Sequence, residues 1–81
     1  MPADTAPHSH LDLRGTPCPL NFIRTRLTLE SVPPGEVLEV LLDRGDPERM
    51  VAEGVAAAGH GVSLEPFDGS AVRLRIRCRG A

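Results

Sequence analysis

The feature that most constrains the fold is the nearly continuous apolar run over residues 37–42, which only Glu39 interrupts. A run of this kind suits a central strand better than a strand at a sheet edge. Proline-containing signals of a helix start stand on either side of it, at Pro17-Cys18-Pro19 and at Asp46-Pro47. The sequence therefore predicts a central strand that is preceded and followed by a helix.

Length and composition limit what the chain can do. Its 81 residues make one domain with one small core, and they leave no room for a second catalytic domain. Hydrophobic residues at 41% and charged residues at 25% indicate a folded protein. Aromatic residues at 2% cannot form a base-stacking surface, and nine arginines against eleven acidic residues do not favour nucleic acid. We therefore expect no direct nucleic-acid binding.

The N-terminal part predicts a tail, a strand and a helix. Residues 1–10 have no periodic apolar pattern, and we expect a flexible tail. Residues 11–14 alternate apolar and polar side chains like a short strand, which stops at Gly15. A helix over about 19–31 follows, with one apolar stripe expected on the sheet and the other partly exposed near Cys18. The two stripes are Leu20, Ile23 and Leu27, and Phe22, Leu29 and Val32.

The C-terminal part predicts a second helix and a hairpin. Asp46 as N-cap and Pro47 at the first helical position begin a helix that runs to about Ala58. Its inward face is expected to comprise Met50, Val51, Val55 and Ala58. Two strands, 62–67 and 71–78, follow around the turn Asp68-Gly69-Ser70 and should be antiparallel.

These elements define the predicted fold class, an α/β (α+β) two-layer sandwich. The order is β-α-β-α-β-β, a four-stranded mixed sheet with both helices on one face. Residues 11–81 are expected to form this single domain.

Cys18 is the strongest candidate for chemistry. A thiol at a helix start lies near the positive end of the helix dipole and near unpaired N–H groups, which favour the reactive thiolate. A thiolate could attack a sulfane sulfur or a disulfide, or hold a persulfide. The alternative is that Cys18 is only a weak helix cap.

Cys78 follows the apolar phase of the last strand, so we interpret it as a small core residue. A disulfide with Cys18 is the alternative. Residues 1–10 show no secretory signal, which predicts a reducing cytoplasm where such a bond is disfavoured, and no membrane association. We predict no metal site, because the two cysteines do not form a CxxC pair and His8 and His10 lack a third ligand.

The last strand carries arginines in the opposite phase, on the face away from the core. They are Arg73, Arg75, Arg77 and Arg79. The row is either a solvated strand face or a docking surface for an acidic protein partner or a phosphate backbone. His60 lies in a predicted helix-stop turn, where it suits a capping role better than that of a catalytic base.

The whole pattern resembles the TusA (SirA-like) family of small sulfur-carrier proteins over about residues 11–79. The matching features are the L-D-x-x-G segment, the Cys18-Pro19 dipeptide at a helix start, Arg26, a Pro-Gly turn, an Asp-Pro helix start and an arginine-rich last strand. Asn21 departs from the family signature Cys-Pro-x-Pro. The resemblance implies that Cys18 accepts sulfur as a persulfide from a cysteine desulfurase or rhodanese-type donor and passes it to a downstream protein.

Further expectations concern the residues around Cys18. We expect Gly15, Pro19, Asn21 and Arg26 to support the thiolate and its loop. Partner docking is assigned to Leu20, Arg73, Arg75 and Arg77.

The leading hypothesis is thus a cytoplasmic, monomeric persulfide carrier, a component of a sulfurtransferase system without a cofactor. A rival is a non-enzymatic regulatory or binding module that uses the arginine row. A thiol peroxidase or disulfide reductase would need a resolving cysteine near Cys18. The destination of the sulfur, such as tRNA thiolation or molybdenum-cofactor synthesis, stays open.

Overall fold

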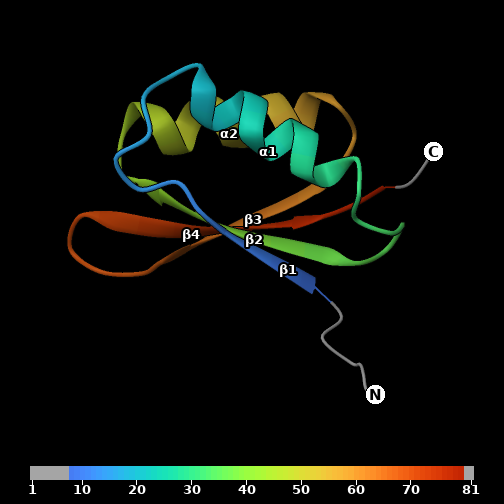
Figure 1. Ribbon diagram of the computed structural model, residues 1–81. Coiled ribbons are helices and arrows are strands. Elements are labelled where there is room, and N and C mark those ends of the chain that lie inside the picture. The colour runs from blue at the N-terminus through green and yellow to red at the C-terminus, as the bar shows by residue number, and fades with distance from the viewer. Residues whose placement is uncertain (1–7, 80–81) are drawn as a thin grey trace.

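The computed structural model describes residues 8–79, with side chains from residue 9 onward. Its elements are β1 (His8–Asp12), α1 (Leu20–Leu29), β2 (Val37–Asp43), α2 (Asp46–Ala57), β3 (Gly61–Pro66) and β4 (Ala71–Arg77). Both helices lie side by side over one face of the sheet, and the other face is uncovered (Figure 1). The predicted two-layer α+β architecture is confirmed.

The four strands form one mixed sheet in the order β1-β2-β4-β3. β1 runs parallel to β2, whereas β4 is antiparallel to both β2 and β3. The run that predicts a central strand is indeed central as β2, and the hairpin prediction for β3 and β4 is confirmed. Because β2 and β4 lie in the middle, their alternate side chains are buried beneath the helices. These are Leu38, Val40 and Leu42, and Val72, Leu74 and Ile76.

The first strand begins earlier than the sequence pattern predicts. β1 starts at His8, and its parallel register with β2 runs from His8 opposite Val37 to Asp12 opposite Leu41. The sequence His8-Ser9-His10 has no strand pattern of its own, so pairing with the neighbouring strand sets its extended conformation. The predicted tail is therefore wrong for residues 8–10, and its remainder, 1–7, lies outside the described residues.

Helix α1 packs on the sheet through one of its two predicted stripes. Leu29 is buried and Phe22 is half-buried against the core. Val32 is buried as well, but it follows the helix, which ends at Leu29 rather than near residue 31. The other stripe is exposed, with exposed fractions of 51% for Leu20, 37% for Ile23 and 55% for Leu27. The buried face of α1 also includes two polar residues, Asn21 and Thr25, which are fully buried.

Helix α2 differs in two details from the prediction. Its N-cap is Gly45, whose N–H donates to the Glu48 carboxylate at 2.8 Å, and Asp46 is already helical. Val51 and Val55 are buried as expected, but Met50 and Ala58 are exposed. Gly54 also faces inward, where α2 lies against the Phe22 ring of α1.

Candidate functional site

Cys18 lies in the loop between β1 and α1. This loop rises from the sheet to the helix side of the molecule (Figure 1). It is exposed, and it immediately precedes Pro19, the N-cap residue of α1. The peptide bond between Cys18 and Pro19 is cis. The prediction that Cys18 is at or next to the N-cap is confirmed, and its thiol is accessible beside the N-terminal end of the helix.

A backbone turn at Gly15 holds this loop against the sheet. Gly15 has a φ of +80°, which glycine adopts without strain, and its N–H donates to the carboxylate of Asp43 at 2.8 Å. The Leu13 N–H donates to the carbonyl of Leu41 at 2.9 Å. Gly15 thus forms a turn that is hydrogen-bonded to the end of β2. Asp43 is a partner that the sequence analysis missed, because 28 residues separate it from Gly15 and no local pattern relates the two.

The start of the loop is fixed by an ion pair between Asp12 and Arg14. The Arg14 guanidinium donates to both carboxylate oxygens of Asp12, at 2.9 and 2.7 Å, and it lies 5.4 Å from the centre of the Phe67 ring. These hydrogen bonds, and the Arg14 N–H bond to the same carboxylate, lower the pKa of Asp12 to about 2. Asp12 in turn raises the pKa of Arg14.

The Asp12 pair predicts a definite pH dependence. The carboxyl pKa is lower in the folded state than its ordinary value of 3.8, so its stabilising contribution is present above pH 3.8 and is lost as the pH falls through about 2. We expect an NMR titration of the Asp12 carboxyl carbon to give a midpoint near 2. In Arg14→Ala the midpoint should return toward 3.8. An unchanged midpoint in that variant would contradict the assigned cause.

Asn21 contacts the thiol of Cys18 directly. Its side chain is fully buried, and its Nδ2 donates to Cys18 Sγ at 3.3 Å. Its Oδ1 accepts a 2.7 Å hydrogen bond from the N–H of Phe22. Asn21 therefore bonds both the thiol and a backbone N–H, and it adds nothing to the surface beside the sulfur because it is buried.

Leu20 and Arg26 are placed differently relative to Cys18. Leu20 is exposed in the first turn of α1, two residues after Cys18, and begins the apolar stripe that continues to Leu27. Arg26 lies in the last turn of the same helix, about 9 Å further along than Leu20 by helical rise. There it lines a hollow together with His60 and other residues of the opposite end. Arg26 is therefore not a local support for the thiolate, since Cys18 lies before the start of the helix and Arg26 lies in its last turn.

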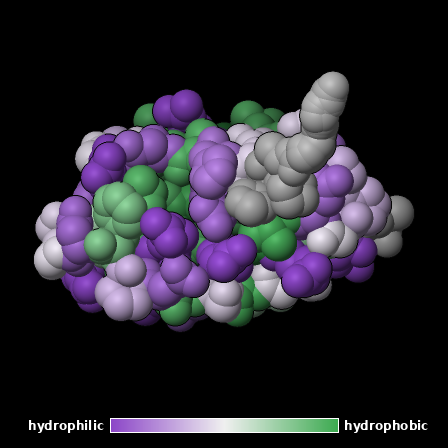
Figure 2. Space-filling view, turned by 90° about the horizontal axis from the view of Figure 1, so that it is seen from below, coloured by the Kyte–Doolittle hydropathy of each residue, from purple (hydrophilic) through white to green (hydrophobic). Residues whose placement is uncertain are grey.

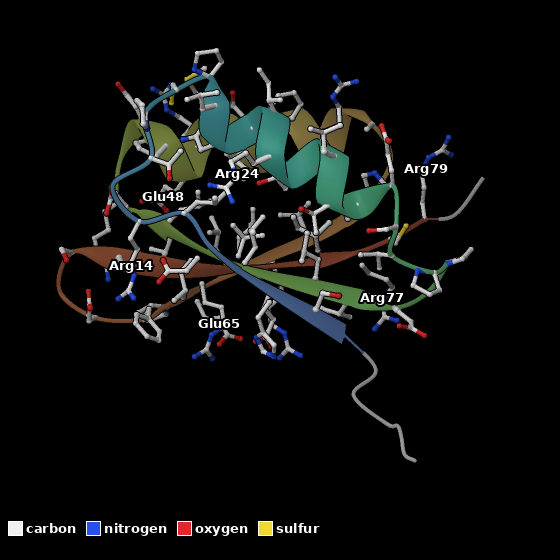
Figure 3. The ribbon with its side chains drawn as sticks, viewed as in Figure 1. Arg14, Arg24, Glu48, Glu65, Arg77 and Arg79 are labelled. Atoms are coloured by element: carbon white, nitrogen blue, oxygen red, sulfur yellow. The ribbon has the colours of Figure 1, made fainter. Side chains whose placement is uncertain are left out.

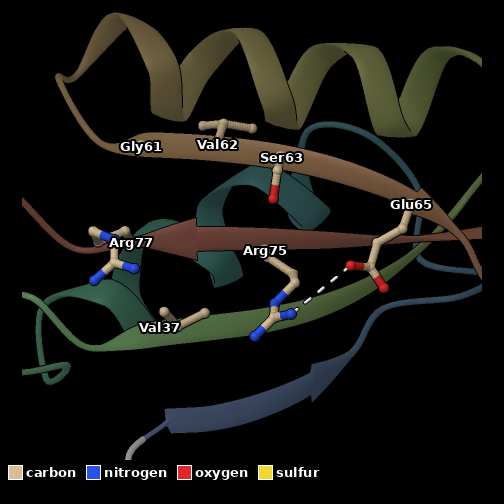
Figure 4. A pocket seen from close by; sticks show the side chains of 7 residues that line it. All are labelled: Val37, Gly61, Val62, Ser63, Glu65, Arg75 and Arg77. Atoms are coloured by element: carbon tan, nitrogen blue, oxygen red, sulfur yellow. Dashed lines mark ion pairs between the residues drawn. The ribbon is translucent and has the colours of Figure 1, made fainter.

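The arginines of β4 lie on the uncovered face of the sheet, as their phase predicts. Arg73 pairs with Glu65 at 3.1 Å, Arg75 pairs with Glu39 at 3.4 Å and with Glu65 at 3.8 Å, and Arg77 donates to the Gly35 carbonyl at 3.0 Å. Arg75 and Arg77 also line a hollow of about 400 Å³ beside β3 (Figure 4). Seen from below, hydrophilic side chains occupy much of the visible surface of this face (Figure 2).

The arginine row does not join Cys18 in one site. Arg77 points to the side of the sheet away from the helices (Figure 3). Cys18 lies instead in the loop just before α1. Arg79 leaves the row, because the strand ends at Arg77. Arg79 points toward the helix side (Figure 3), where it packs against Gly59 and its N–H donates to His60 Nδ1.

The two cysteines have different environments. Both are free thiols, and Cys78 is only 7% exposed within the core cluster, which confirms its predicted packing role. Cys18 is exposed. Within residues 8–79, three or more potential metal ligands do not gather in one place. Over the same residues, neither helix has the length and apolar character needed to cross a membrane.

Fold and site together define a class: a small two-layer α/β domain that presents one exposed thiol at the start of a helix. A family model described as sulfurtransferase TusA matches residues 9–78, so the chain belongs to the TusA family. The resemblance inferred from the sequence is confirmed.

Relatives and a solved structure agree with this membership. The chain is 38% identical to a candidate sulfur carrier protein of Thermotoga maritima, over 85% of this chain and 89% of that protein. It is 44% identical to a candidate sulfur carrier protein of Archaeoglobus fulgidus, over 64% of this chain but only 59% of that protein. A SirA-like protein of Desulfitobacterium hafniense has the same fold, with a TM-score of 0.78 and 19% identity over 88% of this chain and 97% of that one. Family and relatives indicate a sulfur carrier protein.

Proposed function

We propose that this protein carries sulfane sulfur as a persulfide on Cys18, receiving it from one protein and passing it to another. The observation that carries the proposal is the contrast between its two thiols. Cys18 is exposed at the N-terminal end of α1, and Cys78 is buried in the core. Only the first can meet the active cysteine of another protein without unfolding of this domain.

The transfer is a thiol–persulfide exchange with no net oxidation. The Cys18 thiolate attacks the terminal sulfur of a donor cysteine persulfide and forms a new S–S bond. The donor S–S bond breaks, and its electron pair leaves with the donor cysteine as a thiolate. Delivery repeats the step with Cys18 as the leaving thiolate. The N-terminal end of α1 favours negative charge on this sulfur in both steps.

The exposed stripe of α1 suits the docking that this exchange requires. Leu20, Ile23 and Leu27 are exposed apolar side chains in the helix that starts beside Cys18. Exposed apolar residues that gather at a reactive group are typical of a protein interaction site. We propose that a cysteine desulfurase or rhodanese-type donor, and then an acceptor protein, contacts this stripe. The monomer needs no cofactor for this role, and the free thiol suits the reducing cytoplasm.

The arginine row is a weaker basis for function. Arg73 and Arg75 already have carboxylate partners, Glu65 and Glu39, within the same sheet. Much of the positive charge that would attract an acidic partner is therefore neutralised in place.

The test is to weigh the protein after exposure to a cysteine desulfurase with its cysteine substrate. We expect the wild-type intact mass to rise by one sulfur atom, and a reductant to remove the increase. Cys18→Ser should gain nothing because the accepting sulfur is absent.

Cys78→Ala is the matched control, since it also removes one thiol but not an exposed one. This variant should load like the wild type. A wild-type protein that never gains sulfur, or a gain that survives Cys18→Ser, would refute persulfide carriage on Cys18.

A further inference from the structure

Asn21 has an arrangement that fold stability alone does not require. It is a fully buried polar side chain in the first turn of α1, and its amide nitrogen lies 3.3 Å from Cys18 Sγ. Burial of a carboxamide costs free energy unless its donors and acceptors are paired. Here the exposed sulfur of Cys18 is the partner of the buried donor.

The backbone fixes which end of the carboxamide faces the sulfur. The N–H of Phe22 can only donate, so the atom 2.7 Å from it must be the oxygen, Oδ1. The nitrogen is then directed at Cys18 Sγ. A flip of the amide would place two donors against each other at Phe22. The sulfur therefore faces an N–H donor whose orientation is determined by the helix.

Burial and the hydrogen bond from the Phe22 N–H to Oδ1 hold this side-chain donor in place. Thr25, one turn further along α1, is also fully buried, but its hydroxyl donates to the backbone carbonyl of Asn21 at 2.8 Å and does not contact the Asn21 side chain. A donor that is fixed before the reaction stabilises developing charge without the cost of reorientation. A hydrogen bond to a charged acceptor is also stronger than one to a neutral acceptor. The contact between Asn21 and Cys18 thus strengthens when the sulfur becomes negative.

We propose that Asn21 is a positioning residue that donates a hydrogen bond to the Cys18 thiolate, and that it thereby promotes release of the carried sulfur. In release, an acceptor thiolate attacks the terminal sulfur, the bond between that sulfur and Cys18 Sγ breaks, and the electron pair stays on Sγ. Asn21 Nδ2–H faces the atom that receives this charge. The release step rests on the proposed function, whereas the hydrogen bond to the thiolate does not.

The first experiment compares Asn21→Asp with the wild type. Aspartate has the same shape and keeps the acceptor for the Phe22 N–H, but it replaces the donor facing the sulfur with an acceptor. We expect alkylation of Cys18 by iodoacetamide at one neutral pH to slow about threefold to tenfold. Discharge of the preformed persulfide by cyanide, which yields thiocyanate and the Cys18 thiolate, should slow at least as much.

Thr25→Ala is the matched control. It removes a buried polar group from the same helix face and lowers the unfolding midpoint, but it leaves the sulfur contact of Asn21 intact. Both rates should stay at the wild-type values. The neutral variant Asn21→Ala separates loss of the donor from repulsion by the new carboxylate, and it should also slow both reactions. Wild-type rates in folded Asn21→Asp and Asn21→Ala would overturn the proposal.

A second measurement needs no variant that might fail to fold. Asn21 is the only carboxamide residue in the sequence, which contains no glutamine, so its side-chain NH₂ pair can be identified directly in a ¹⁵N NMR spectrum. We expect this pair to shift when methyl methanethiosulfonate converts Cys18 into its methyl disulfide with release of methanesulfinate. Unchanged chemical shifts of this NH₂ pair would refute the hydrogen bond between Asn21 and Cys18. A protein that shows the shift and the slower alkylation but never accepts sulfur would refute the proposed function and leave the Asn21 contact established.

Discussion

Replacement of Leu74 by alanine is expected to lower the free energy of unfolding by about 2–5 kcal/mol. Leu74 is fully buried in the middle of β4, which itself lies between β2 and β3, opposite Val40 and Leu64. Truncation removes apolar contacts on both sides and leaves a cavity under the helices. A domain of this size has a total free energy of unfolding of about 4–12 kcal/mol, so the expected loss is a large fraction of the total. Urea unfolding followed by circular dichroism measures the loss.

Leu64→Ala is the matched control, with the same change on the same face of the sheet. Leu64 pairs directly with Leu74 in the register, but β3 is an edge strand and the side chain is 47% exposed. We expect its truncation to cost about 1 kcal/mol or less. Equal losses in the two variants would contradict the strand order, because they would require β3 and β4 to be equally covered by the helices.

The second large effect is expected from Gly54→Ala. A Cβ atom at this position would lie 2.3 Å from Cε1 and 2.9 Å from Cδ1 of the Phe22 ring. Alanine gains about 1 kcal/mol of helix propensity over glycine, but displacement of a packed ring costs about 1–3 kcal/mol, and the contacts here are severe. We expect a net loss of about 1–2 kcal/mol, measured as a lower urea midpoint.

Ala56→Gly tests the propensity term by itself. Ala56 is exposed in the same helix, so its replacement by glycine should cost about 0.5–1 kcal/mol. The protein should therefore be more stable with glycine than with alanine at position 54, and more stable with alanine than with glycine at position 56. In a Phe22→Leu background the penalty of Gly54→Ala should shrink, because the ring atoms that it meets are gone. A penalty that persists unchanged there would locate its cause outside the contact between α1 and α2.

Much of the fold is predictable from the sequence because local signals agree with one another. The apolar run that became β2, the proline-marked helix starts and the Asp68-Gly69-Ser70 turn each specify an element without reference to the rest of the chain. Cys18 is found in the same way, since its position before a helix is a local property. The phase of β4 likewise separates Cys78, which is buried, from the outward-facing arginines.

Other features depend on contacts between distant segments. Which stripe of α1 is buried, and why Asn21 and Thr25 are buried with it, is decided by how the helix lies on the sheet. The apolar stripe of Leu20 is as hydrophobic as its rival, so composition could not distinguish them. Asp43 meets Gly15 only because β2 ends beside the turn after β1.

The sequence by itself determined the order of the elements and the thiol at the helix start, because both follow from interactions between near neighbours in the chain. Only the tertiary structure decided that Arg26 lies far from that thiol, that Asp43 bonds the turn at Gly15, and that a buried amide meets the sulfur. The physical reason is that a side chain's distance from a site depends on helix length and packing orientation. Neither quantity is encoded in the residue's immediate neighbours.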